Sequence, residues 1–324
     1  MRPIAEAYKD FPILHKEHNG HRVIYLDSGA TAQIPQSVID RVVEHMTQRN
    51  GNPHRGSHIL AIEASEDYEN ARDRVVEFIN AREREEVVFT RNSTESMNLI
   101  AHSYGLHNVK KGNKIVITVA EHHANLVTWQ YVAEQTGATL EYMYLDEHGH
   151  LKDGEINKID ENTKIVAFAH VSNVLGMEFP VKELTEKAHS VGAVVVLDGA
   201  QSTPHKKIDV QELDCDFFVF SGHKMCASQG IGVLYGKREL LEAMPPFLLG
   251  GDMIEYVKEQ TATFNELPYK FEAGTPNADG AVSLHAAIDY LESFGMDAIE
   301  AYEEELVAYI LPKIVALPHV HVIG

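Results

Sequence analysis

The alternation of short apolar runs with helical patterns is the feature of this sequence that most restricts its fold. Seven runs rich in β-branched or aromatic residues predict strands, at residues 86–91, 114–119, 139–145, 164–170, 194–198, 216–221 and 231–235. Helical patterns lie between and after them, at residues 93–107, 124–136, 153–159, 181–191 and 238–243. Such alternation predicts an α/β fold whose seven-stranded, mostly parallel sheet carries helices on both faces.

The length of 324 residues suits one large domain and part of a smaller one. We expect residues 21–281 to form the large domain and residues 282–324 to begin a small α+β domain that is incomplete here. The N-terminal segment, residues 1–20, is expected to pack against that small domain. Two helical patterns and one strand-like run follow the large domain, at residues 282–294, 296–316 and 319–323.

Composition excludes several classes of partner and site. Acidic side chains outnumber basic ones 48 to 28, which argues against nucleic acid or an anionic membrane as a partner. No apolar run approaches the roughly 18 residues that a membrane span needs, and no signal-peptide pattern opens the chain. Two cysteines exclude a disulfide framework and favour a reducing cytoplasm. No HExxH, CxxC or strand-to-helix GxGxxG spacing predicts a metal or a dinucleotide.

An acid and a lysine end two of the predicted strands. Asp198 ends the run 194–198, and Lys224 closes Ser221-Gly-His-Lys after the run 216–221. Ligands of parallel sheets collect at the carboxyl ends of the strands. The lysine would form a Schiff base with pyridoxal phosphate (PLP), and the carboxylate would pair with its pyridine nitrogen. Alone, Lys224 reads as a solvated lysine and Asp198 equally as a helix N-cap, so the combination carries the prediction.

Other loops at strand ends offer groups for the same cofactor. Gln201 could bond its phenolic oxygen. Ser93 and Thr94 open a helix and could bind its phosphate, although such sequences are mostly plain caps. His122 could stack on its ring and act as an acid or base, or lie at the surface near a cap. In the Pro/Gly loop at residues 50–57, Arg55 could bind a carboxylate or phosphate.

Eight stretches in order carry a resemblance to a known family. They are residues 25–33 (YLDSGATAQ), 52–58 (NPHRGSH), 89–95 (FTRNSTE), 121–129 (EHHANLVTW), 170–176 (HVSNVLG), 196–201 (VLDGAQ), 220–224 (FSGHK) and 271–277 (FEAGTPN). Together they resemble the SUF-type cysteine desulfurases and selenocysteine lyases, which are class V, fold-type I PLP enzymes. The resemblance covers nearly the whole chain.

The resemblance implies a role for each matching residue. Lys224 corresponds to the Schiff-base lysine, Asp198 to the partner of the pyridine nitrogen, and His122 to the ring-stacking, catalytic histidine. Gln201 falls where the family contacts the phenolic oxygen. The remaining positions are implied to bind the phosphate (Thr94, Ser221 and His223), the phosphate of a neighbouring subunit (Thr275), the substrate and cofactor ring (Asn173), and the substrate (His54 and Arg55).

The implied activity is removal of sulfur from L-cysteine or selenocysteine, in a homodimer that passes a persulfide to an acceptor protein for iron–sulfur cluster assembly. Two essentials of the family, a mobile-loop cysteine and a carboxylate-binding arginine, have no match here. A non-catalytic PLP-binding fragment therefore stays an alternative, as does a related class V aminotransferase or lyase. Residues 226–230 and Thr128 also depart from the family pattern. Cys215 is expected to be a buried structural thiol. Cys226, two residues past Lys224 and near the cofactor, could have a lowered pKa, but it lacks the swing of a mobile loop and is not expected to be a reactive thiol.

Overall fold

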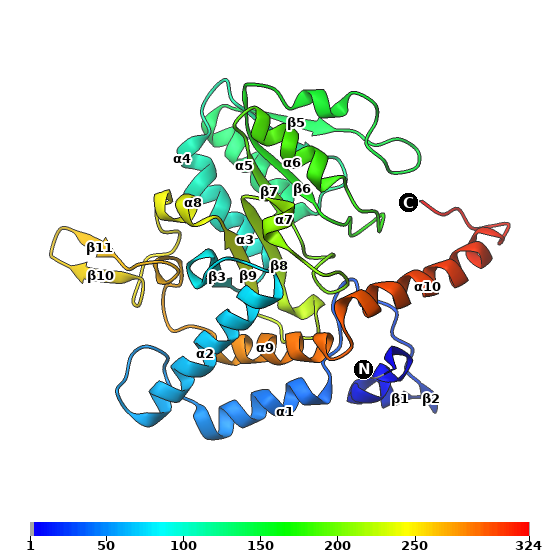
Figure 1. Cartoon of the computed structure of the whole chain (residues 1–324), viewed down its shortest axis with the longest axis horizontal. Helices are drawn as coiled ribbons and strands as arrows, with labels where there is room; N and C mark the ends of the chain where they lie inside the picture. Colours follow the sequence, from blue (N-terminus) through cyan, green and yellow to red (C-terminus); the bar gives the residue numbers. More distant parts are fainter. Residues whose placement is uncertain (1–2, 324) are drawn as a thin grey trace.

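A seven-stranded sheet stands at the centre of the computed structural model, which describes residues 3–323 (Figure 1). Its strand order is β3 (Val87–Thr90), β9 (Gly232–Gly236), β8 (Phe217–Ser221), β7 (Val194–Asp198), β6 (Thr163–Ala169), β4 (Lys114–Thr118) and β5 (Thr139–Met143). Strand β9 runs antiparallel to β3 and β8, and the other neighbours are parallel. The seven predicted strands and the mostly parallel sheet are confirmed.

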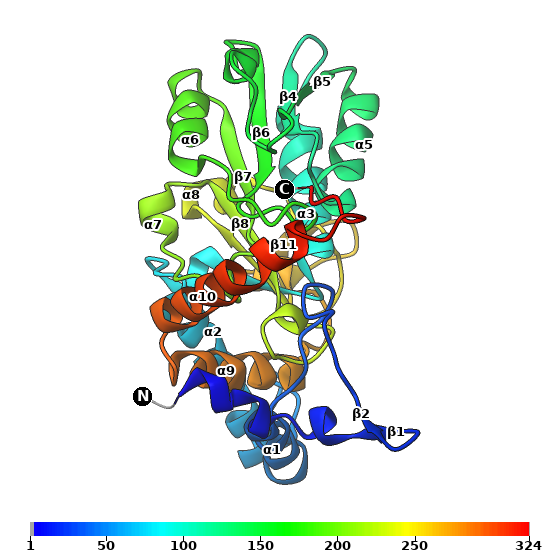
Figure 2. The ribbon, with the colours of Figure 1, turned by 90° about the vertical axis from the view of Figure 1, so that its right-hand side faces the viewer.

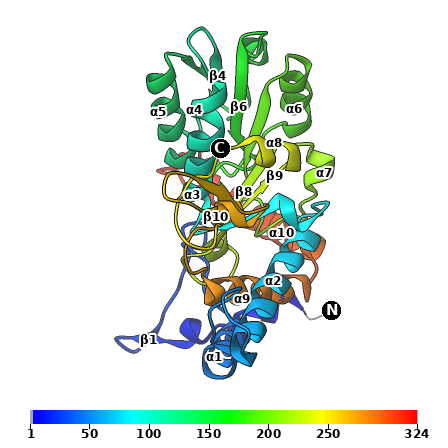
Figure 3. The same ribbon diagram turned by 90° about the vertical axis from the view of Figure 1, so that its left-hand side faces the viewer.

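Side chains alternate between two apolar layers because successive residues of a strand face opposite sides. In β6, Val166 and Phe168 join one buried cluster, while Ile165 and Ala167 join the other. Helices cover both layers, and Figures 2 and 3 show α5 on one side of the sheet and α6 and α7 on the other. The prediction of helices on both faces is therefore confirmed.

The helices are α1 (Gln36–Glu44), α2 (Ile59–Phe78), α3 (Ser93–Ile100), α4 (Leu106–Asn108), α5 (Val127–Thr136), α6 (Val181–Ser190), α7 (Val210–Leu213), α8 (Arg238–Ala243), α9 (Ala278–Glu292) and α10 (Met296–Val315). The helix expected at 93–107 is split, because a π-helical turn at Ala101–Gly105 separates α3 from α4. The helix expected at 153–159 is only a 3-10 turn, Glu155–Lys158. No pattern predicted α1 or α2.

The strand expected at residues 319–323 is wrong. These residues carry no regular structure, because no described strand offers them a pairing partner. Two short hairpins were also unforeseen: β1 (Glu17–His18) with β2 (His21–Arg22), and β10 (Ile254–Val257) with β11 (Ala262–Phe264). The second projects from the body in Figure 1.

The N-terminal segment lies against the last two helices. The ring of Phe11 packs edge-on against Tyr290 of α9, at 5.7 Å between centroids. Helix α9 is buried along much of its length, whereas α10 buries only Met296. The domain boundaries at residues 21 and 282 stay predictions. Among residues 3–323, no helix combines the length and apolar character needed to cross a bilayer.

Candidate active site

A cavity of about 630 Å³ opens where the parallel strands end. Eight of the nine residues predicted to bind the cofactor line it: Thr94, His122, Asn173, Asp198, Gln201, Ser221, His223 and Lys224. Asp198 ends β7, Ser221 ends β8, and Lys224 closes the 3-10 turn that follows. The sheet thus delivers the acid and the amine to one space, although their chain positions lie far apart.

Asp198 keeps one carboxylate oxygen available to a ligand. Its Oδ1 accepts a hydrogen bond from the backbone N–H of Ala200 at 3.0 Å. Among the described residues, its Oδ2 receives no hydrogen bond. The segment that follows forms turns and not an α-helix, so the N-cap alternative does not hold. Burial raises the pKa of Asp198, and the nearby charge of Lys224 acts to lower it.

Lys224 has the electrostatic surroundings of a reactive amine. Burial lowers its pKa, while the Asp198 carboxylate acts in the opposite direction. A lowered pKa enlarges the neutral fraction of the amine, and only the neutral amine attacks a carbonyl. The two groups therefore have the chemistry expected of a PLP site.

Hydroxyl groups gather at the start of α3, beside the end of β8. The Ser221 Oγ accepts a hydrogen bond from the Ser93 backbone N–H and lies 2.9 Å from the Ser93 Oγ. The cap of α3 is Asn92, whose Oδ1 accepts from the N–H of Glu95 at 3.0 Å. Because Asn92 does the capping, the Ser93 and Thr94 hydroxyls are not needed for it. A helix N-terminus with such hydroxyls suits a phosphate.

His122 is held by the turn that follows it. Its Nδ1 accepts a hydrogen bond from the Ala124 N–H at 3.1 Å, so the neutral ring carries its proton on Nε2. Burial lowers the pKa of His122, which favours this neutral form. The ring lines the cavity with Asp198 and Lys224.

Residues 26–30 form one wall of the cavity, and none of them was predicted as a site residue. Leu26, Asp27, Gly29 and Ala30 line it, and the Gly29 carbonyl accepts from the Gln201 side-chain amide at 2.9 Å. The matching stretch 25–33 was the available signal. Its residue types, mostly small or apolar, gave no chemical reason to select it.

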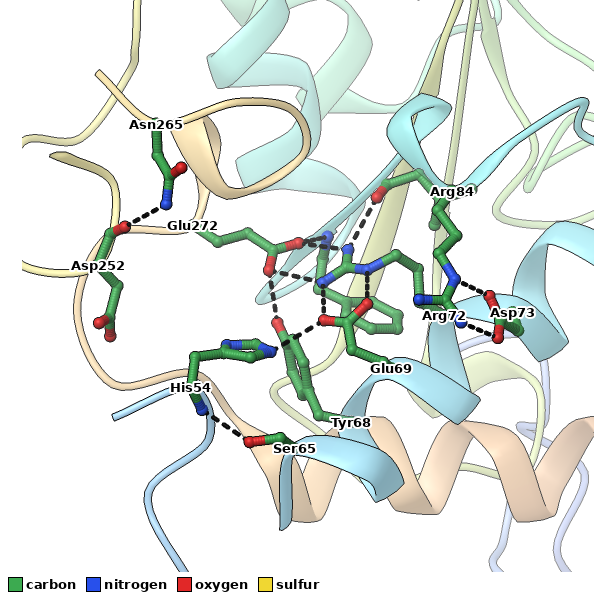
Figure 4. Close-up of polar contacts among 12 residues, drawn as sticks. His54, Ser65, Tyr68, Glu69, Arg72, Asp73, Arg84, Asp252, Asn265 and Glu272 are labelled. Atoms are coloured by element: carbon green, nitrogen blue, oxygen red, sulfur yellow. Dashed lines mark hydrogen bonds and ion pairs between the residues drawn. The ribbon is translucent and has the colours of Figure 1, made fainter. Parts of the chain in front are cut away.

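His54, Arg55 and Thr275 do not reach this cavity. The His54 ring packs edge-on against Tyr68 and Tyr269, at 5.7 and 5.2 Å between ring centroids. Its Nε2 is 3.2 Å from the Glu69 carboxylate (Figure 4). Arg55 forms an ion pair with Asp252. His54 and Arg55 line a second cavity of about 390 Å³, and Thr275 lines a third of about 550 Å³. The substrate-binding roles predicted for His54 and Arg55, and the role of Thr275 at the phosphate of a neighbouring subunit, stay predictions.

Neither cysteine is suited to nucleophilic chemistry. Cys215 is fully buried, as expected, and burial raises the pKa of its thiol far above the usual range. Burial raises the pKa of the Cys226 thiol to about 12, which excludes the lowered pKa that was considered and agrees with the expectation that this thiol is not reactive. Within residues 3–323, no group of three or more His, Cys, Asp or Glu side chains is arranged to hold a metal ion.

Comparison with known proteins places the chain in a family. The aminotransferase class-V family model matches residues 24–324. A probable cysteine desulfurase of Halalkalibacterium halodurans is 51% identical over 320 residues, which cover 98% of this chain and 79% of that protein. This chain belongs to the cysteine desulfurase group of the class V aminotransferases. A probable cysteine desulfurase of Synechocystis is 48% identical, over 99% of this chain and 76% of that protein.

Solved structures of cysteine desulfurases have the same fold. CsdA of Escherichia coli superposes with a TM-score of 0.89 at 38% identity, over 98% of this chain and 79% of CsdA. The enzyme of Thermococcus onnurineus superposes with a TM-score of 0.91 at 40% identity, over 97% of this chain and 77% of that one. The expected fold type I is thus confirmed. The family cofactor is pyridoxal phosphate, and the cavity fits it, since it combines a lysine, a buried acid and a hydroxyl-lined helix N-terminus.

Proposed function

We propose that this chain is a PLP-dependent cysteine desulfurase, which converts L-cysteine and a thiol to L-alanine and a persulfide. The observation that carries the proposal is the meeting of Lys224 and Asp198 in one cavity, with His122 beside them. The named relatives favour this activity over the non-catalytic alternative.

When bound, the cofactor supplies an electron sink that stabilises negative charge on the substrate α-carbon. Lys224 Nζ would hold the cofactor through its amine and would move the substrate α-proton. Asp198 Oδ2 would accept a hydrogen bond from the protonated pyridine nitrogen. The hydroxyls of Ser93, Thr94 and Ser221 would orient the phosphate.

The thiol that accepts the substrate sulfur is not evident among the cysteines, because Cys215 and Cys226 are both buried and their pKa values are raised. Transfer needs a thiolate that can reach the substrate sulfur. We therefore assign this role to neither thiol, and propose that an acceptor protein receives the sulfur for iron–sulfur cluster assembly. A thiol reductant can take its place in an assay.

We also propose a cytoplasmic homodimer. His54, Arg55 and Thr275 line cavities other than the one that Lys224 lines. In a homodimer they could serve the active site of the second copy. Whether cysteine or selenocysteine is preferred is decided by comparing kcat/KM for the two amino acids.

The test is turnover by the PLP-loaded chain with L-cysteine and dithiothreitol. Alanine and sulfide should form in equal amounts, and Lys224→Ala should abolish both along with the cofactor absorbance band. Lys207→Ala, which changes an exposed lysine, is the matched control and should behave as wild type. A wild-type chain that binds PLP but releases no alanine from either amino acid would refute the proposal. Formation of a keto acid without sulfide would instead identify an aminotransferase.

A further inference from the structure

Glu121 is a buried carboxyl group next to His122 in the chain, with no part in the chemistry described above. It is 7% exposed and lies between β4 and the 3-10 turn His123–Asn125. Its Oε1 is 2.5 Å from the Thr118 hydroxyl and accepts from the Ala169 backbone N–H at 3.2 Å. Its Oε2 accepts from the Asn125 side-chain amide at 2.6 Å.

These contacts join three segments at the mouth of the sheet. Thr118 ends β4, Ala169 ends β6, and Asn125 precedes α5. Asn125 is itself fixed, because its Oδ1 accepts from the Trp129 indole N–H at 2.8 Å and both residues are fully buried. The indole N–H can only donate, so the amide must present its NH₂ to Glu121.

Glu121 and Asn125, which hydrogen-bond to each other, flank His122 in the sequence. Glu121 precedes it, and the Asn125 N–H donates to the His122 carbonyl at 2.8 Å. Ala169, which donates to Glu121, lines the cavity and pairs in register with Asp198. A shift of Glu121 would therefore move the turn that carries the His122 ring.

We propose that Glu121 is a positioning residue for His122, an inference that rests on the proposed function. Its hydrogen bonds fasten the histidine turn to the ends of β4 and β6 and so fix the ring over the cavity. Side chains that orient reacting groups must hold them closely, because a displacement of about 1 Å can cost about a hundredfold in rate.

The pKa of Glu121 is affected by the same hydrogen bonds. Burial raises the pKa of Glu121 to about 8, against hydrogen bonds from Thr118 and Asn125 that act to lower it. Asp198 adds to the rise.

A reciprocal exchange of acid and amide tests the proposal. In Glu121→Gln, the new NH₂ group faces one of two donors. These are the Asn125 NH₂, which cannot flip without losing the Trp129 bond, and the Ala169 N–H, so one hydrogen bond is lost in either orientation. In the double variant Glu121→Gln/Asn125→Asp, the new carboxylate can accept from both the new amide and the indole. We expect the single variant to lose at least tenfold in kcat and the double variant to recover to within about threefold of wild type.

A second readout does not need turnover. The ring NMR signal of His122, assigned through His122→Asn, should shift in Glu121→Gln and return in the double variant, with thermal unfolding checking that each protein is folded. Glu161→Gln, at an exposed position before β6, is the control and should change neither signal nor rate.

Wild-type rate and an unmoved His122 signal in Glu121→Gln would overturn the proposal. If the single variant does not fold, the double variant decides: a folded double variant without recovery of the signal also overturns it. If wild type itself makes no alanine, the proposed function fails, while the NMR comparison still tests Glu121.

Discussion

Removal of the Glu272 carboxylate should destabilise the protein more than removal of any exposed acid. Arg72 of α2 is fully buried, and its Nη1 and Nη2 donate to Glu272 at 2.7 and 2.9 Å (Figure 4). Glu272 also accepts from the Phe89 backbone N–H at 2.7 Å and from the Tyr68 hydroxyl at 2.8 Å. Glu272→Ala would leave a buried guanidinium with Glu69 as its remaining carboxylate partner.

The magnitude follows from the burial of the pair. Breaking a buried ion pair by removing one partner costs roughly 3–5 kcal/mol. At roughly 2 °C per kcal/mol for a chain of this size, the Tm should fall by about 6–10 °C. Thermal unfolding followed by circular dichroism measures this directly.

Glu292→Ala is the matched control, because Glu292 also pairs with an arginine, Arg74, but its side chain is 40% exposed. Exposed pairs contribute about 0–1 kcal/mol, so its Tm should fall by no more than about 2 °C. Equal shifts in the two variants would refute the view that Arg72 and Glu272 form a buried, coupled pair.

Three further outcomes are expected. Ser221→Ala should weaken PLP binding about tenfold, as the loss of one phosphate-orienting hydroxyl worth about 1.4 kcal/mol, and an unchanged affinity in an absorbance titration would argue against this role. Cys226→Ala should retain the wild-type rate of alanine release, and loss of activity in the folded variant would restore Cys226 as a candidate nucleophile. Burial acts to raise the pKa of Glu69, but His54 and Arg72 lower it to about 2. Glu69 therefore stabilises the fold above about pH 4.5, and this contribution should disappear between pH 4.5 and 2; denaturant titrations of wild type and Glu69→Gln that keep parallel pH profiles there would contradict it.

Patterns within single segments predicted the sheet well, because its strands are buried on both faces and read as continuous apolar runs. The hairpin β10–β11 escaped prediction because its side chains are largely exposed, so no buried face imposes alternation. Helix α2 also carries buried polar residues, Asp67 and Arg72, at positions where an amphipathic helix would show apolar ones. Their partners lie on distant segments that sequence periodicity does not reveal.

Site residues could be predicted where a charged side chain directly follows an apolar run that predicts a strand. Asp198 and Lys224 stood out because charged groups follow buried runs. Glu121 did not, since its Thr118 and Asn125 partners are ordinary polar neighbours in the sequence, while its burial and its bond to the Ala169 N–H of β6 appear only in the folded chain. For Cys226, closeness to Lys224 in sequence left a lowered pKa open, because it did not disclose the burial of the thiol.

The central claim is that Lys224 holds the cofactor while Asp198 faces it from another strand. Borohydride reduction of the PLP-loaded chain, followed by digestion and peptide mass spectrometry, tests it most directly. We expect the pyridoxyl group on Lys224, with the yield reduced in Asp198→Asn at limiting PLP. A pyridoxyl group on a different lysine, or none in a chain that binds PLP, would contradict the account.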